Sequence, residues 1–369
     1  MTPSQQQLTP FSRSLVLLHR ACPRRGFLTY RYKASPQQVD GGIQSPRQSP
    51  DLAIGTALHL ANETLLLHPD YPLAQLVNEC LATPEILNGQ ANGFSLVEPA
   101  NLERFMAHLR TLITGMCWIM QKHLVPSLLS TYKVTKVEHE FKPYAQGQFA
   151  LQGRTDAIFE GDFGEPVIGS MKTAAVYSQT SAGMQEYDTQ GLTESWLYFQ
   201  EFGTWPGVQM YTLIKGLKRK QDGMVTYEGP LTKCYRKVYV KDGRIAWSAD
   251  YTSGWDKMSV EDYPGGALVY YRDVLSQSPQ LERTWARPMA TSRSQAAAAD
   301  CIGHMFNEVT HWFSNTSNEL ADHAPHHEDC LSFGGLCGFH EPCQRGVPLV
   351  QLDYVPRKPH HPNLLEEED

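Results

Sequence analysis

The segment GRTDAIFEGDFGEPVIGSMKTA, residues 153–174, constrains the fold more than any other part of the sequence. β-Branched and aromatic residues on both sides of the turn GDFGE predict two adjacent antiparallel strands. Asp156 lies on the first strand and Lys172 on the second, so the pairing brings their side chains together on one face of the sheet. A carboxylate can hold a hard divalent cation, and a nearby ammonium can stabilise negative charge at phosphorus. The pair therefore indicates phosphodiester hydrolysis, although a strand aspartate beside a strand lysine is also a common structural pair.

Periodicity places this strand pair between two helical regions. Apolar spacing predicts helices at residues 12–30, 52–67, 102–129, 189–202, 263–277 and 294–314, the first of them leading into an extended aromatic segment. Alternating patterns predict strands at residues 133–141, 147–160, 166–177, 207–218 and 233–241. Residues 35–50 are rich in Gln, Gly, Ser and Pro and predict a loop. Helices, then a short sheet, then helices predict an α/β fold with a mixed central sheet.

Charge and cysteine content narrow the class of protein. No apolar run approaches the roughly 20 residues of a membrane helix, and the net charge is −7. Residues 1–39 contain arginine and lysine but no acid, which suits either an organelle import signal or a surface that binds phosphate. Eight cysteines, mostly scattered, do not indicate a secreted disulfide scaffold. We expect a cytoplasmic protein without a membrane partner.

Positive charge is concentrated in three segments, Arg13–Lys33, Lys215–Lys220 and Lys233–Lys237. Local patches, rather than net charge, steer a protein to nucleic acid. The plain alternative is that all three are solvated surfaces.

Further polar residues fall at suggestive positions around Asp156 and Lys172. His59 follows Gly55 on a predicted helix, Glu138 and Glu140 share one face of a strand, and Gln190 begins the helix after Lys172. A single helical histidine is more often a packed or exposed residue than a metal ligand. Taken together and in this order, the motifs resemble the RecB-like branch of the PD-(D/E)XK nuclease superfamily. The resemblance extends over residues 12–345 when the cysteine motif described below is included. Its matches in the core are Gly55, His59, Glu138, Gly153, Arg154, Asp156, Lys172, Thr173 and Gln190.

This resemblance implies a restriction-endonuclease-like core and an exonuclease that hydrolyses DNA from single-stranded ends with Mg²⁺ or Mn²⁺, in recombination, repair or replication. It implies that His59, Glu138, Asp156 and the Met171 carbonyl hold the metal, that Lys172 assists the attacking water, and that Gln190 positions the lysine or the substrate. It also implies DNA as a partner, contacted in part by Arg154, with a helicase or recombination protein as a further partner. The expected organisation is one nuclease domain over 1–345, with a helical part at 12–130, a sheet core at 131–240, a helical and Cys-rich part at 241–345, and a tail at 346–369.

The sequence departs from the family pattern at two positions. The family's acid two residues before the lysine is Ser170 here, whether native or introduced, and a hydroxyl cannot replace a carboxylate's charge at a metal. The family's tyrosine four residues after the glutamine is Glu194, which makes Glu194 a candidate replacement acid. Glu165 lies on the opposite strand face by parity. A catalytically impaired DNA-binding member, and an unrelated metalloprotein, are the alternative interpretations.

Cysteines near the two ends of the sequence form a second motif. Cys330, Cys337 and Cys343 lie in a Gly-rich segment, and Cys22 precedes a proline and two arginines, Arg24 and Arg25. Four cysteines with one remote in sequence suit an iron–sulfur cluster, and RecB-like nucleases that carry a [4Fe-4S] cluster show this distribution. The resemblance also implies that Arg24 and Arg25 face DNA. Zinc is the alternative, because four histidines lie nearby and Cys₃His is a common zinc site; free thiols are the third reading.

Overall fold

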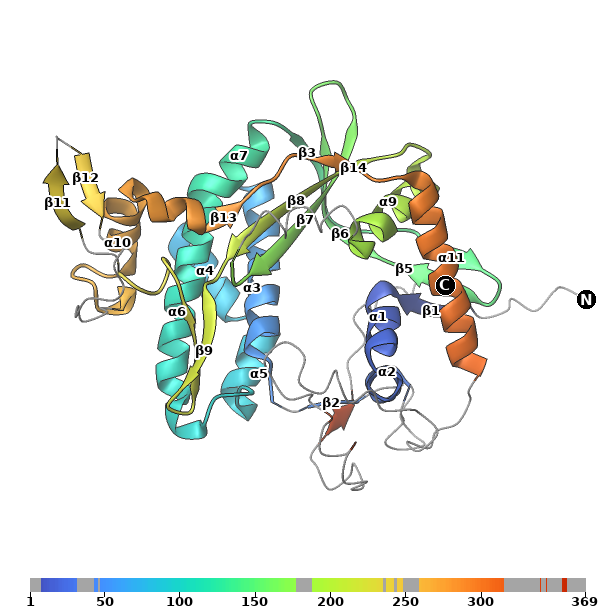
Figure 1. The fold of residues 1–369 in the computed structure, drawn as a ribbon, viewed down its shortest axis with the longest axis horizontal. Coiled ribbons are helices and arrows are strands. Elements are labelled where there is room, and N and C mark those ends of the chain that lie inside the picture. The colour runs from blue at the N-terminus through green and yellow to red at the C-terminus, as the bar shows by residue number, and fades with distance from the viewer. Residues whose placement is uncertain are drawn as a thin grey trace, which may run out of the picture. The chain divides into compact units, whose positions relative to one another are not determined.

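The computed structural model describes residues 8–31, 43–45, 47–176, 188–234, 237–241, 244–247, 259–314, 339, 343 and 354–356 (Figure 1). The chain divides into two compact units whose segments alternate along the sequence. The terminal unit comprises Met1–Pro46, Lys142–Gly153 and Ala299–Asp369, and the sheet unit comprises Arg47–Phe141 and Arg154–Ala298. The expected division into consecutive parts of one nuclease domain stays a prediction.

A mixed sheet forms the centre of the sheet unit. Its strand order is β13-β8-β7-β6-β3, and β14 also pairs with β8. The strands are β3 (Lys133–Glu140), β6 (Arg154–Glu160), β7 (Pro166–Ala174), β8 (Gly207–Ile214), β13 (Trp285–Ala286) and β14 (Thr291–Ser292). β7 and β8 are parallel, whereas the other pairs are antiparallel. The predicted α/β fold with a mixed sheet is therefore confirmed.

Helices cover this sheet and bury its apolar side chains. They are α3 (Pro50–Leu67), α4 (Leu73–Leu81), α5 (Pro84–Asn92), α6 (Leu102–Ile119), α7 (Val125–Leu129), α9 (Thr189–Phe202) and α10 (Ala267–Asp273). α3 contacts β3, β6 and β7 and lies beside α6 (Figure 1). Side chains such as Ala57 of α3, Phe159 of β6 and Met171 of β7 share one buried core. Burial of such side chains contributes on the order of 2 kcal/mol each, which holds α3 on the sheet.

Several predicted helix limits differ from the observed ones. The predicted helix 102–129 contains a π-helical turn, Met120–Leu124, between α6 and α7. The predicted helix 263–277 is shorter, because α10 covers only Ala267–Asp273 and is flanked by 3₁₀ turns Val260–Asp262, Leu275–Gln277 and Pro279–Arg283. The sequence patterns did not predict α4 and α5.

The predicted strand 207–218 is wrong in its second half. β8 ends at Ile214, and the chain then turns through Gly216 into a separate hairpin of β9 (Leu217–Gln221) and β10 (Met224–Glu228). Gly216 has a φ of +92°, and a Cβ atom there would lie 2.5 Å from the Glu228 carbonyl oxygen. Only glycine fits this crossing of two backbones. The predicted strand 233–241 is likewise shorter, since β11 (Lys237–Lys241) pairs with β12 (Arg244–Trp247).

The terminal unit collects strands and helices from three parts of the sequence. It contains β1 (Thr9–Ser12), α1 (Arg13–Ala21), α2 (Pro23–Tyr30), β2 (Ile43–Gln44), β4 (Tyr144–Gln146), β5 (Phe149–Gln152), most of α11 (Gln295–Ser314) and β15 (Val355–Pro356). The expected single helix leading into an extended segment is wrong, because Pro23 starts a new helix that continues to Tyr30. The predicted strand 147–160 breaks at Gly153, so that β5 pairs with β1 and β4 while β6 joins the central sheet.

Candidate metal centre

Three potential metal ligands meet in the sheet unit from three different elements. His59 of α3, Glu138 of β3 and Asp156 of β6 each offer one ligand atom, and these atoms lie within 4.8 Å of one another. Nδ1 of His59 is 3.0 Å from Oδ1 of Asp156 and 3.9 Å from Oε1 of Glu138. The structure thus brings together the three side chains that the sequence named as metal ligands.

The hydrogen-bonding state of these atoms is what a cation site requires. Nδ1 of His59 and Oε1 of Glu138 are both buried. Nδ1 faces the Asp156 carboxylate at 3.0 Å without the alignment of a good hydrogen bond, and Oε1 has no hydrogen-bond partner among the described residues. Buried polar atoms are rarely left without partners. One imidazole nitrogen and two carboxylates are ligands that Mn²⁺ accepts readily, and Mg²⁺ favours the carboxylates. The residues present therefore fit a divalent cation.

Asp156 lies where two strands separate. The paired register of β6 and β7 ends at Ala157 and Gly169. Beyond it the Asp156 carboxylate, which is 12% exposed, accepts a hydrogen bond of 2.6 Å from the Met171 backbone N–H. The side chain of Asp156 thus replaces a backbone acceptor in the gap between the strands. The proposed role of the Met171 carbonyl stays a prediction.

The backbone of Glu138 is unusual for a strand residue. Its φ is +47°, a region that side-chain-bearing residues seldom adopt. Its carboxylate lies 3.0 Å from Nε of Arg154, whose side chain is 45% exposed. Arg154 thus contacts a candidate metal ligand, and its expected contact with DNA stays a prediction. Strained residues of this kind gather at functional sites.

Burial and neighbouring charge set the pKa values of these three groups in the metal-free protein. Burial raises the pKa of Glu138 to about 7, with Asp156 adding to the rise and Arg154 opposing it. Burial alone would raise the pKa of Asp156, but contacts with His59 and the Met171 N–H lower it below its usual value. Burial lowers the pKa of His59, yet the two carboxylates outweigh it and the net shift is upward. Glu138 and His59 therefore hold their protons more tightly than usual in the metal-free protein, and a bound cation would displace these protons.

α9 supplies the polar side chains next to this trio. Asp188 caps the helix and Gln190 lies in its first turn, where its side-chain oxygen accepts a hydrogen bond from Nζ of Lys172. Nε2 of Gln190 donates to Glu194 at 2.6 Å. The amide of Gln190 therefore holds the lysine and the glutamate on one side of the site.

Glu194 occupies the position next to Ser170. Oγ of Ser170 donates to Oε2 of Glu194 at 2.7 Å, and both residues are buried. Burial raises the pKa of Glu194 to about 7, with the negative charge of Asp156 adding to the rise and Lys172 opposing it. A carboxylate thus reaches the point where the family pattern has its acid, although it comes from α9 instead of β7.

Two residues that the sequence analysis did not name complete the site. The Thr155 hydroxyl lies within hydrogen-bond distance of the Gly169 carbonyl, at 3.2 Å, and of Glu194, at 3.4 Å, and can donate its one proton to either, so it links the separated strands to α9. Asn62, fully buried on α3, accepts a hydrogen bond from the Tyr211 hydroxyl at 3.2 Å. The spacing of Asn62 from His59, one helical turn, was the available signal.

The structure describes two of the four cysteines expected to form the cluster, Cys22 and Cys343, both in the terminal unit. Cys22 ends α1 and caps α2, its Sγ accepting a hydrogen bond of 3.4 Å from the Arg25 N–H. Nη1 of Arg24 lies 3.3 Å from the backbone oxygen of Cys343. Cys330 and Cys337 lie outside the described residues, as do the histidines near them. Arg24 contacts the Cys343 backbone, and the predicted contacts of Arg24 and Arg25 with DNA stay predictions.

The comparisons with known proteins do not assign a family. No protein-family model and no curated protein matches the chain. One solved structure, described as "Crystal structure of SSO0001", aligns with 78% of this chain and 84% of its own at 11% identity and a TM-score of 0.25, a level of likeness that carries no argument. None of the described helices is long and apolar enough to cross a membrane.

Proposed function

We propose that this chain is a divalent-metal-dependent DNA nuclease with a restriction-endonuclease-like core of the RecB-like type. The observation that supports it is the convergence of His59, Glu138 and Asp156 on one point, where Oε1 of Glu138 is buried without a hydrogen-bond partner among the described residues. Lys172 and Glu194 interact electrostatically with Asp156, so the site combines a cation site with a nearby positive charge and a further carboxylate. This combination suits a phosphodiester better than an ester or amide, because phosphoryl transfer needs charge neutralisation above all.

Each side chain has a separate role in the proposed reaction. His59, Glu138 and Asp156 would hold Mg²⁺ or Mn²⁺, which would supply neutralising charge at the phosphate and acidify bound water. Lys172, oriented by Gln190, presents its ammonium group to the reacting phosphate. Glu194 has a pKa of about 7, so its carboxyl group can take up or release a proton at neutral pH. The convergence of these groups favours a nuclease over the alternative of a DNA-binding member without activity.

The test is a cleavage assay with labelled single-stranded DNA, Mn²⁺ and the full chain. We expect cleavage that EDTA abolishes. His59→Ala, Asp156→Asn and Lys172→Ala should each lower the rate at least about 100-fold, because each removes a ligand or charge at the reacting phosphate.

Two substitutions elsewhere in the sheet unit serve as matched controls. His68→Ala changes an exposed histidine at the end of α3, and Lys133→Ala changes an exposed lysine at the start of β3. Both should cleave DNA at the wild-type rate. Absence of cleavage by the wild type, or equal loss in control and site variants, would contradict the proposed function.

We also propose that Cys22, Cys330, Cys337 and Cys343 hold a [4Fe-4S] cluster. The thiol of Cys22 at the first turn of α2 suits a thiolate ligand, because the helix N-terminus favours negative charge. The contact of Arg24 with Cys343 supports proximity of the two cysteine segments.

Substitution of Cys22 with serine should remove the brown colour of the anaerobically purified protein and lower its melting temperature. The reason is that the cluster would join remote segments of the terminal unit. Visible absorbance and iron per chain measure this. Cys301→Ser, at a half-buried free cysteine of α11, is the control and should keep both. A colourless wild type with one bound zinc would instead support the zinc site.

A further inference from the structure

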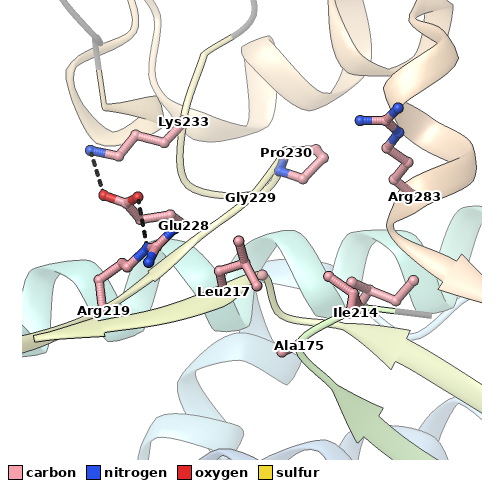
Figure 2. A pocket seen from close by; sticks show the side chains of 11 residues that line it. Ala175, Ile214, Leu217, Arg219, Glu228, Gly229, Pro230, Lys233 and Arg283 are labelled. Atoms are coloured by element: carbon pink, nitrogen blue, oxygen red, sulfur yellow. Dashed lines mark ion pairs between the residues drawn. The ribbon is translucent and has the colours of Figure 1, made fainter. Parts of the chain in front are cut away.

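A pocket of about 400 Å³ lies beyond the carboxyl ends of the two parallel strands, β7 and β8. Ala175 directly follows β7 and Ile214 ends β8, and both line the pocket (Figure 2). Ligands of α/β sheets commonly bind outside the carboxyl ends of parallel strands. The pocket belongs to the sheet unit, and none of the metal-centre residues lines it.

Three cations line this pocket against one carboxylate. Figure 2 shows Arg219 and Lys233 near Glu228 on one side and Arg283 on the other. Glu228 lies 3.9 Å from Nε of Arg219 and 4.0 Å from Nζ of Lys233, so it only loosely balances two of the charges. Arg283 is exposed and forms no ion pair within the described part of the chain. The pocket therefore keeps an excess of positive charge.

The backbone around the cations is fixed before any ligand arrives. The carbonyl of Thr284, a fully buried residue, accepts a hydrogen bond of 2.8 Å from the Ile214 N–H, which holds the neighbouring Arg283 beside β8. On the opposite side, the close crossing of Gly216 and Gly229 holds the chain that carries Glu228. A binding site on such rigid segments loses little conformational entropy when it fills.

Apolar side chains occupy the space between the cations. Ile214, Leu217 and Pro230 lie between Arg219 and Arg283 in Figure 2. Cations at the rim suit a phosphate, and apolar walls suit the sugar or base attached to it. Ala175 is three positions after Lys172, which corresponds to about 10 Å of extended chain. A DNA strand held at the metal centre can therefore reach the pocket.

We propose that this pocket binds a nucleotide of the substrate strand between two adjacent phosphates, one on Arg219 and Lys233 and the other on Arg283, and so positions the strand next to the metal centre. This proposal rests on the proposed nuclease function. It assigns a role to part of the basic segments Lys215–Lys220 and Lys233–Lys237. Two other lysines, Lys215 and Lys218, are instead held by Asp51.

The test measures binding without cleavage. The full chain is titrated into a fluorescent single-stranded oligothymidylate in EDTA at several salt concentrations. Arg283→Ala should raise Kd at least about fivefold and reduce the magnitude of the salt slope by about 0.7, the value for one phosphate contact on a single strand. Glu228→Gln should tighten binding, because it removes the carboxylate that lines the pocket among the described residues, and it tests the site without truncating a cation.

The matched control is Lys220→Ala, which removes one exposed positive charge from the same hairpin outside the pocket. It should change Kd less than twofold. Equal weakening by Arg283→Ala and Lys220→Ala, or no tightening by Glu228→Gln, would overturn the proposal. Competition should be stronger with thymidine monophosphate than with inorganic phosphate, and equal competition would overturn the assignment to a nucleotide.

The outcomes separate this proposal from the proposed function. If binding depends on Arg283 but the protein never cleaves DNA, the nucleotide pocket is supported and the nuclease function is contradicted. If cleavage depends on Lys172 but binding is unaffected by Arg283→Ala, the nuclease function is supported and the nucleotide pocket is contradicted.

Discussion

Glu194→Gln is expected to lower Mn²⁺-dependent cleavage of single-stranded DNA at least about 100-fold while leaving the fold intact. Glutamine keeps the shape of the buried side chain and can still accept the hydrogen bond from Ser170, which is 2.7 Å long. It removes the one carboxylate that α9 contributes next to Ser170. The loss would therefore report on charge and proton transfer, and an unchanged melting temperature would exclude a packing defect.

Ser170→Asp provides the complementary experiment. In the wild-type background it adds a second carboxylate beside Glu194, so we expect no gain in cleavage and a further rise in the pKa values of the pair. Combined with Glu194→Gln, the same aspartate would restore one negative charge at the site and recover part of the lost activity. A large gain from Ser170→Asp alone, or full activity of Glu194→Gln, would show that Glu194 does not supply the missing acid.

The second large effect concerns stability and pH. Compared with Glu194→Gln, the metal-free wild type should lose stability as the pH rises from about 5.5 to 8, whereas the lowered pKa values of His108, His123 and His139 act in the opposite direction in both proteins. Burial raises the pKa of Glu194 from 4.5 to about 7, so the folded state binds a proton that the unfolded state has already released. The stability from that proton is present at low pH and disappears as the pH passes the folded pKa, a loss on the order of 2 kcal/mol. Glu138 and His59, whose pKa values are also raised, act in the same direction.

Thermal unfolding in EDTA at the two pH values measures this dependence. Glu194→Gln should remove part of it, because glutamine does not titrate. Mn²⁺ should stabilise the protein more at pH 8 than at pH 5.5, since the cation competes with protons for the same ligands. A Glu194→Gln variant with the same pH dependence as the wild type would contradict the raised pKa of Glu194.

Local sequence patterns predicted β3, β7, the residues of β6 and β8, and the helix that follows Lys172, because their residues carry the period of the element they form, but they did not predict the two-residue strands β13 and β14. The predicted helix 189–202 has the limits of α9, and Asp156 and Lys172 do lie on adjacent antiparallel strands. Patterns of this kind depend on neighbours along the chain, so they can be recognised without knowledge of the tertiary fold.

What the sequence could not predict depended on contacts between distant residues. The break at Gly153 occurs because β5 pairs with β1, over 130 residues earlier, while β6 pairs with β3. No periodic pattern in the sequence indicates that β6 and β7 separate at one end or that Glu138 has a positive φ. Glu194 could be named only through the family pattern, because a glutamate on a helix does not reveal that it will be fully enclosed beside Ser170.

Pairing between remote strands also has a consequence for the order of events during synthesis. In the terminal unit, Gln44 of β2 pairs with Val355 of β15. At translation rates of about 5–20 residues per second, roughly 300 intervening residues delay that pairing by about 15–60 s. The sheet unit can fold in this interval, while Phe11 and His19 still lack their contacts with Phe306 and Trp312, which are synthesised later. The N-terminal segment therefore keeps apolar surface exposed during synthesis, a state in which nascent chains aggregate unless chaperones bind them.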